Sequence, residues 1–416
     1  MTGTEGDDAV VPREERRLVL GLSALQFVHV LEFMIVMPLG PDLGRALGVS
    51  SEHLGIFGGA YTLAAFVAGL AGSFVLDRFP RDRALFWSAL GLIVATCLCG
   101  FATHAAMLLG FRILAGLMGG PVTALAVALV TDVVPLRRRG RAMSTLLGAF
   151  SVASVLGVPA ALMLGTWGGW RTPFFAIAAL GVLVLPLALR AVPKSTPAPP
   201  RPAREILSGF GALVRRPEAM AGLAMTLAAS AGSFALIPNL SAYMQHNLGL
   251  PRTELPAVYL LGGVLTFIAM QVTGRIVDRH GSPLPGWIIS LAYIGLLGAA
   301  FLQEPRAWPP ALVGALFMLG NGARVVTTGT MSTRIPRPEE RAGFSSLQAS
   351  FQNLGSALGA GAGTLFLTSR PDGGLDGIPS LTWLTIVLTL LVPALLSWLD
   401  RRLAVRPLST PSGIAP

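Results

Sequence analysis

Hydrophobic positions along this chain form long, nearly continuous runs that are separated by short polar stretches. A helix needs about 20 mainly apolar residues to cross some 30 Å of hydrocarbon. Twelve runs of that kind occur, six on each side of a polar break near the middle of the chain. They cover residues 18–39, 54–76, 84–101, 105–131, 142–165, 171–190, 217–243, 255–277, 285–302, 308–332, 342–367 and 380–399. The pattern predicts an all-α membrane protein with twelve spanning helices in two sets of six.

The break, residues 192–216, is rich in proline and arginine. Proline-rich segments favour extended conformations, so we expect an exposed, extended linker between the two sets. The first apolar run is as long as a full span and has no obvious small-residue cleavage site after it, so we expect it to be retained. The predicted organisation is an N-terminal tail, a first bundle, a linker, a second bundle and a C-terminal tail, at residues 1–17, 18–191, 192–216, 217–402 and 403–416.

The two sets of spans repeat a short motif about two hundred residues apart. Residues 73–78 read Ser-Phe-Val-Leu-Asp-Arg, and residues 274–279 read Gly-Arg-Ile-Val-Asp-Arg. A second pair, 135–141 and 336–341, begins with proline and ends with arginine in both copies. Duplicated apolar halves are typical of secondary transporters, which alternately expose a site between the halves to either side of the membrane. The repeat therefore predicts a transporter.

Composition and charge place the chain in a lipid bilayer. Hydrophobic residues make up 53% of the chain and charged residues 12%, whereas soluble domains carry roughly 25% charged residues. The net charge of +10 does not indicate nucleic-acid binding, because the basic residues lie in the breaks between apolar runs. With the N-terminus inside, 24 of the 31 Lys and Arg residues fall on that side. By the positive-inside rule, the protein is expected in the inner (plasma) membrane with both termini cytoplasmic.

Several other classes of protein are disfavoured. Cys97 and Cys99 are two positions apart, do not share a helical face and read as small buried hydrophobes. The lone lysine, Lys194, lies in the linker, so no phosphate-binding loop of an ATP-driven pump is present. No common hydrolase or protease motif occurs. We expect no enzyme activity, no cofactor and no metal, and we expect a monomer in the lipid bilayer.

Three segments resemble the major facilitator superfamily. Residues 73–83 resemble its signature between spans two and three, although serine and proline stand where glycine is usual, and the second copy lacks the trailing basic residues. Residues 108–116 resemble the span-four motif of proton-coupled members. Residues 155–171 are similar to the span-five region of the twelve-span drug:proton antiporters, including their sugar-efflux branch. The resemblance implies two pseudo-symmetric six-helix bundles, with spans one and four lining a central cavity.

Charged residues at the cytoplasmic ends of the spans are candidates for a gate. Asp77 and Asp278 close spans two and eight, where they can pair with Arg141 and Arg341 or bind a neighbouring helix N-terminus. Asp132 is a candidate partner for either arginine of the first motif. The expected cytoplasmic gate is Asp77, Arg78, Arg81, Asp132, Arg141, Asp278, Arg279 and Arg341. The alternative is that these are ordinary solvated loop charges.

Span five carries Pro159 two residues after Gly157. Proline removes one backbone hydrogen bond and crowds the preceding turn, so this pair predicts a kink. The glycines of this span alternatively serve close helix packing alone.

Glu32 is the carboxylate that lies well inside a predicted span. At 1.5 Å per residue, Glu32 on span one and Arg112 on span four both lie roughly 9 Å from the outer face. A glutamate alone in lipid is favoured in its protonated form, whereas one beside Arg112 is held ionised. A carboxylate that alternates between these conditions can carry a proton, with His29 on the same helical face as a relay. The alternatives are a static ion pair and a structural histidine.

The spans of the second half contain no acid but several other polar side chains. As a substrate cavity we expect Asn239, Tyr243, Gln271, Asn321, Arg324 and Gln352. Arg324 has no carboxylate near it in the sequence, so it either meets an anionic substrate group or extends towards the cytoplasm.

The sequence therefore predicts a proton-coupled exporter of a small organic molecule, such as a drug-like compound or a sugar, that works by alternating access. The alternatives are proton-coupled uptake, an uncoupled facilitator, a membrane receptor and a membrane-embedded enzyme.

Overall fold

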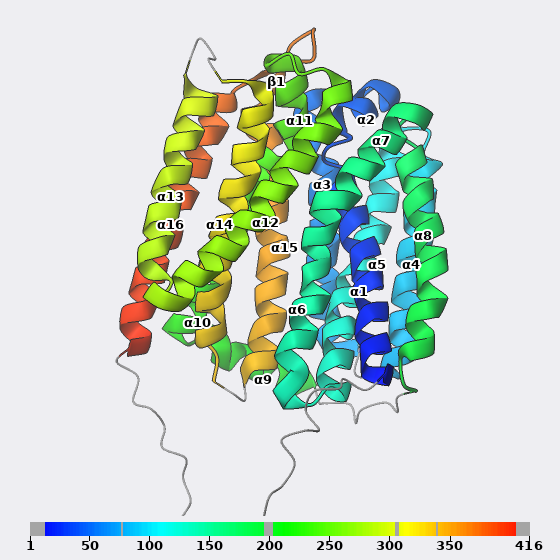
Figure 1. Cartoon of the computed structure of the whole chain (residues 1–416), viewed down its shortest axis with the longest axis vertical. Coiled ribbons are helices and arrows are strands. Elements are labelled where there is room, and N and C mark those ends of the chain that lie inside the picture. The colour runs from blue at the N-terminus through cyan, green and yellow to red at the C-terminus, as the bar shows by residue number, and fades with distance from the viewer. Residues whose placement is uncertain (1–12, 76–77, 195–202, 304–307, 338–339, 405–416) are drawn as a thin grey trace, which may run out of the picture.

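Twelve long helices in two sets of six make up most of the molecule (Figure 1). The structure, a computed structural model, describes residues 13–75, 78–194, 203–303, 308–337 and 340–404. The first set is α1 (Arg13–Ile35), α3 (Gly55–Val75), α4 (Arg81–Gly100), α5 (Ala105–Val133), α6 (Leu136–Val152) continued by η3 (Ala153–Gly157) and α7 (Val158–Gly168), and α8 (Thr172–Ala191). The second set is α10 (Pro217–Leu236) continued by η4 (Ile237–Asn239), α11 (Leu240–Ala242) and η5 (Tyr243–Asn247), then η6 (Arg252–Glu254) with α12 (Leu255–His280), α13 (Pro283–Leu297) with η7 (Gly298–Leu302), α14 (Pro310–Arg334), α15 (Arg341–Phe366) and α16 (Ile378–Ala404).

Eleven of these helices, within the described part of the chain, are long and apolar enough to cross a membrane. The twelfth, α15, is 26 residues long but carries serine, glutamine and asparagine along its first half. It lies between α10 and α3, so both of its long sides pack against other helices. The prediction of twelve spanning helices in two bundles is confirmed.

The two bundles repeat the same neighbour relations. In the first bundle α1 packs against α6 and α8, α3 packs against α5, and α4 packs against α5 and α8. In the second bundle α10 packs against α15 and α16, α12 against α14, and α13 against α14 and α16. Each helix thus has a counterpart six helices later, as the repeated motifs predict. Between the bundles, α3 contacts α15, and α7 with η3 contacts α12.

The two ends of the molecule differ (Figure 1). At one end lie the short helix α2 (Gly40–Leu47), η1 (Ser51–His53) and the antiparallel pair β1 (Thr368–Ser369) and β2 (Leu375–Asp376). We call this the hairpin end. At the other, the linker end, α1 begins, α16 ends and α9 (Ala203–Val214) lies between the bundles.

Two details of the predicted elements are wrong. The linker is not extended throughout, because residues 203–214 form the amphipathic helix α9. On this helix Leu213 is buried in the second bundle, and the Phe210 ring meets Phe74 of α3 edge-on at 6.5 Å. The first span ends at Ile35 and not at residue 39, because Pro38 disfavours helical geometry in the residue before it.

Candidate functional site

Glu32 of α1 and Arg112 of α5 form a fully buried ion pair in the first bundle. Both side chains have 0% of their surface exposed. The Arg112 Nε also donates to the Phe57 carbonyl at 3.4 Å, and the guanidinium lies 4.6 Å from the centre of the Tyr61 ring. Glu32 Oε2 and Arg112 Nη2 have no hydrogen-bond partner among the described residues. The hydrogen-bonding capacity of the pair is therefore only partly used, although both of its charged groups are buried.

A chain of hydrogen bonds extends from the same tyrosine towards the linker end. The Tyr61 hydroxyl lies 3.0 Å from His29 Nε2, and the Thr123 hydroxyl lies 3.3 Å from His29 Nδ1. Thr123 in turn donates to Gln26 Oε1 at 3.1 Å. Since the single hydroxyl proton of Thr123 is used there, a neutral His29 with its proton on Nδ1 donates to Thr123 and accepts from Tyr61. Four side chains from α1, α3 and α5 thus form one continuous path.

Gly119 of α5 provides the space for this path. A Cβ atom at Gly119 would lie 2.3 Å from the Tyr61 hydroxyl and 3.1 Å from the His29 ring. One turn earlier, a Cβ at Gly116 would lie 2.2 Å from the Tyr61 carbonyl oxygen. Glycine at both positions lets α3 and α5 approach closely enough for the tyrosine to reach both His29 and Arg112.

Sequence reasoning named Glu32, His29 and Arg112 but missed the other members of the path. Gln26 lies three residues before His29 on the same helical face, so its position could have been found from helical spacing. Tyr61 and Thr123 carry no such signal, because only the packing of α3 and α5 against α1 brings them to His29.

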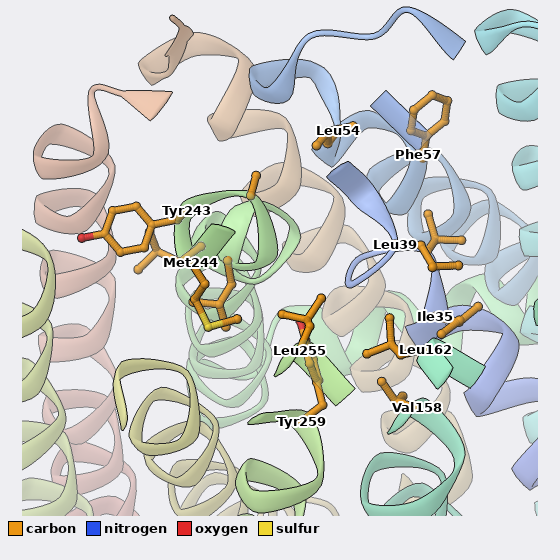
Figure 2. Close-up of a cluster of buried hydrophobic side chains, with 14 of the residues drawn as sticks. Ile35, Leu39, Leu54, Phe57, Val158, Leu162, Tyr243, Met244, Leu255 and Tyr259 are labelled. Atoms are coloured by element: carbon orange, nitrogen blue, oxygen red, sulfur yellow. The ribbon is translucent and has the colours of Figure 1, made fainter. Parts of the chain in front are cut away.

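At the hairpin end, an apolar cluster closes the space between the bundles (Figure 2). Figure 2 shows Ile35, Leu39, Leu54, Phe57, Val158 and Leu162 of the first bundle together with Tyr243, Met244, Leu255 and Tyr259 of the second. All ten side chains are buried, and Ile35 and Leu39 have 0% of their surface exposed. Close backbone approach accompanies this packing, since a Cβ at Gly55 would lie 2.6 Å from the Ala360 carbonyl oxygen.

Polar contacts complete the closure at the same end. Asp42 of α2 pairs with Arg252 of the second bundle at 2.7 Å, and both side chains are largely buried. Ser51 donates to the Gly373 carbonyl at 3.0 Å, and Ser369 bonds the Glu52 carboxylate. Among the ion pairs between described residues, Asp42–Arg252 is the one that joins the two bundles. The protein is therefore closed at the hairpin end.

At the linker end, the ion pairs between described residues each stay within one bundle. Arg81 contacts Asp132, and Arg138 contacts Glu15 at 2.8 Å, in the first bundle. Arg334 contacts Asp400 at 2.9 Å in the second bundle. Of the two arginines considered for Asp132, the structure selects Arg81.

The other expected gate residues form no bridge in the described part of the chain. The side chains of Arg78, Arg141, Asp278, Arg279 and Arg341 are exposed. Asp77 lies outside the described residues. In this conformation these described residues therefore do not join the two bundles.

The polar residues of the second bundle lie in several different surroundings. Asn321 accepts from Ser233 at 2.6 Å and donates to the Tyr293 hydroxyl at 3.0 Å, and Arg324 lies over the same tyrosine ring. Tyr243 instead points to η7, where its hydroxyl donates to the Ala300 carbonyl at 3.2 Å.

The remaining three expected cavity residues make no hydrogen bond through their side chains among the described residues. Asn239 is 1% exposed, and both of its amide atoms lack a partner. Gln271 and Gln352 are exposed.

Span five is interrupted at the position of the predicted kink. The π-helical turn η3 ends at Gly157, two residues before Pro159. A Cβ at Gly157 would lie 3.0 Å from Leu31 and 3.2 Å from Phe27 of α1. The wide turn and the small residue together let this span pass close to α1.

Residues 22–360 match the model of the Major Facilitator Superfamily. The chain is 28% identical over 340 residues to a chloramphenicol resistance protein of Streptomyces lividans. This alignment covers 80% of the present chain and 83% of that protein. The chain is also 28% identical over 308 residues to the purine ribonucleoside efflux pump NepI of Escherichia coli O6:H1, covering 73% of this chain and 72% of the pump.

Two solved structures have a similar fold. A bacterial homolog of the human lysosomal transporter Spinster, in an inward-facing and occupied conformation, aligns with a TM-score of 0.70 at 18% identity over 94% of this chain and 98% of its own. A D-xylose–proton symporter aligns with a TM-score of 0.70 at 16% identity over 92% and 97%. Both likenesses concern the fold alone.

Proposed function

Because the chain belongs to the major facilitator superfamily, we propose that it exports a small organic molecule in exchange for protons by alternating access. Membership makes it a multi-pass membrane transporter of small molecules and not an enzyme. The direction and the coupling ion are the proposal. The relatives named as a resistance protein and an efflux pump support export.

The buried pair of Glu32 and Arg112 is the observation that carries the coupling. A buried carboxylate stays ionised only while a cation or hydrogen bonds compensate the loss of hydration. Arg112 compensates Glu32 here, and one oxygen of the carboxylate is left without a partner. When the bundles move or a substrate draws Arg112 away, protonation of Glu32 becomes favourable, and the reverse motion releases the proton. An intramembrane ionisable pair of this kind is by default a functional site.

As the proton's route beyond the ion pair we assign the path through Tyr61, His29, Thr123 and Gln26, whose first member contacts Arg112 through its ring. Gln26 precedes Glu32 by six residues on α1, which corresponds to about 9 Å along the helix axis. The path leads towards the linker end, away from the apolar closure at the hairpin end. We assign His29 as the relay, since both ring nitrogens are engaged and a proton can enter on one while another leaves from the other.

The closed hairpin end fits the exporter cycle in a state that loads substrate from the cytoplasm. The positive-inside rule puts the linker end, with most of the arginines, in the cytoplasm. In the opposite state the linker end must close, and the charges at Asp77, Asp278, Arg141 and Arg341 are then available for inter-bundle contacts. Export ends with opening of the hairpin end, which requires the Asp42–Arg252 pair to separate.

The function is tested with purified protein in liposomes under an imposed pH gradient. Labelled chloramphenicol and labelled inosine, a purine ribonucleoside, are the first probes because relatives are named for these classes. Antiport predicts that a probe accumulates in liposomes with an acidic interior, because protons leave as substrate enters, and that a protonophore abolishes the accumulation. Accumulation only with an acidic exterior would establish symport, and equilibration without accumulation would establish a facilitator.

Removing the charge at Arg252 is expected to open the hairpin end more often. In Arg252→Gln, Asp42 keeps only Arg45 of its own helix as a cationic partner, so no described ion pair then joins the bundles. A cysteine placed at Leu39, whose side chain is 0% exposed, should react several-fold faster with a membrane-impermeant maleimide added from outside.

The matched control for this measurement is Arg45→Gln. It removes the other arginine bound to the same carboxylate, at 2.6 Å, but leaves the contact between the bundles intact. Labelling at position 39 should then match the parent protein. Equal acceleration in both variants would show that the Asp42–Arg252 pair does not hold the hairpin end closed.

A further inference from the structure

Each bundle holds one buried arginine that lies over a tyrosine ring. In the first, Arg112 lies 4.6 Å from the centre of the Tyr61 ring; in the second, Arg324 lies 5.0 Å from the centre of the Tyr293 ring. Both are nearly or fully removed from solvent, with 0% and 3% of their surface exposed. The two arginines differ in their counter-charge, because Arg112 has a carboxylate partner and Arg324 has none among the described residues.

Arg324 has no carboxylate partner among the described residues. Its Nε, Nη1 and Nη2 atoms are all buried and all without a partner. The interacting neighbour is the Tyr293 side chain. The acids of the second half that the structure describes lie at helix ends or in loops, as Glu218, Asp278 and Asp400 do. No helix of this bundle therefore offers a counter-charge at the depth of Arg324.

The position also excludes the alternative in which the side chain extends to the cytoplasmic surface. Arg324 lies ten residues before Arg334, the last residue of α14, which corresponds to about 15 Å along the helix axis. Its guanidinium is turned into the bundle, onto α13, and is almost completely buried.

An arginine cannot relieve this situation by losing its proton, because guanidinium remains charged in proteins. A buried charge without a partner is strongly unfavourable. The groups around it are polar but neutral: Asn321 lies one turn earlier, bonded to Tyr293 and to Ser233 of α10. These bonds fix the tyrosine ring beneath the guanidinium, and none of these groups supplies a negative charge.

We propose that Arg324, held over Tyr293, binds an anionic group that enters the second bundle, so that a ligand supplies the charge that Glu32 supplies in the first. The planar guanidinium fork suits a carboxylate in a two-point contact. The anionic group belongs either to the transported molecule, which would make that molecule an organic anion, or to a free inorganic anion bound as a counter-ion. The proposal deepens the proposed transport function, which supplies the route of entry when the bundles separate.

The test measures thermal unfolding of the purified wild-type protein with matched charged and neutral probes. Sodium benzoate and benzamide have nearly the same shape, but only benzoate carries a negative charge at neutral pH. The unfolding midpoint should rise with the logarithm of the benzoate concentration, because a ligand that binds only the folded state stabilises it. Benzamide at the same concentrations should have no effect. A rise with sodium chloride relative to sodium gluconate, but not with benzoate, would assign the site to an inorganic anion.

Arg324→Gln removes the charge and should abolish the anion-dependent rise of the unfolding midpoint. Without anions, the unfolding midpoint of this variant should be equal to or above that of the wild type. Arg324→Lys keeps the charge without the fork and should retain a smaller rise. Arg275→Gln, which removes an exposed arginine of α12, is the control and should respond as the wild type does. An absent response in the wild type, or an undiminished one in Arg324→Gln, would overturn the proposal. Because these are equilibrium measurements without a pH gradient, they succeed or fail independently of proton antiport.

Discussion

We expect Glu32→Gln to abolish accumulation driven by a pH gradient, while substrate exchange at equal pH on both sides continues. The amide has nearly the shape of the carboxylate and can still accept a hydrogen bond from Arg112, but it cannot take up or release a proton. Labelled substrate should still exchange with unlabelled substrate across the liposome membrane, because the movement of the bundles does not require a proton when substrate returns. In acid-loaded liposomes the labelled probe should reach only its external concentration.

The matched control is Glu15→Gln, which changes the other buried glutamate of α1. Glu15 is 7% exposed and is bonded to Arg138 at the linker end, far along the helix from Glu32. This variant should keep gradient-driven accumulation. If Glu32→Gln accumulated the probe as the wild type does, Glu32 would be a structural residue and the proton site would have to lie elsewhere.

Arg112→Met is expected to reduce the free energy of unfolding by up to about 3–5 kcal/mol, because it leaves Glu32 buried without its cation, and by less where the carboxylate takes up a proton. The double variant with Glu32→Gln should recover most of that loss, since no uncompensated charge then remains. Denaturant titration of the wild type, both single variants and the double variant gives the interaction energy directly.

Arg171→Met is the control for the loss of an arginine stacked on an aromatic ring. Arg171 lies 4.4 Å from the centre of the Trp170 ring and donates to the Ala102 carbonyl at 2.9 Å, but it is exposed, so its removal should cost no more than about 1.5 kcal/mol. A double variant as unstable as Arg112→Met alone would mean that Arg112 stabilises the bundle through Phe57 and Tyr61 and not through Glu32.

The membrane fold could be predicted from the sequence with few errors. The apolar runs predict all twelve spans, and the alternation of basic loops supports that number, although α15 is less apolar than the other eleven. The elements between the spans were not predicted, namely α2, α9 and the hairpin of β1 with β2. They lie outside the spans, where hydropathy carries little information.

The site could be predicted only in part. Glu32 and Arg112 were placed at similar depth by counting residues, because a helix advances by a fixed rise. Their contact, and the bonds of His29 to Tyr61 and Thr123, depend on how α1, α3 and α5 are rotated towards one another. The expected substrate residues show the same limit, since Tyr243 turned out to face η7 and not Arg324.

The sequence by itself determined that this chain crosses the bilayer twelve times, that its halves are copies and that its first half carries an acid within a span. These properties follow from the transfer of whole segments from water to lipid, which depends on composition and not on neighbours. Tertiary structure alone decided which charges are compensated. It pairs Glu32 with Arg112 and Asp42 with Arg252, and it places no described carboxylate beside Arg324. The reason is that electrostatic compensation depends on distances of a few ångströms between helices, and helical spacing fixes only the positions along each one.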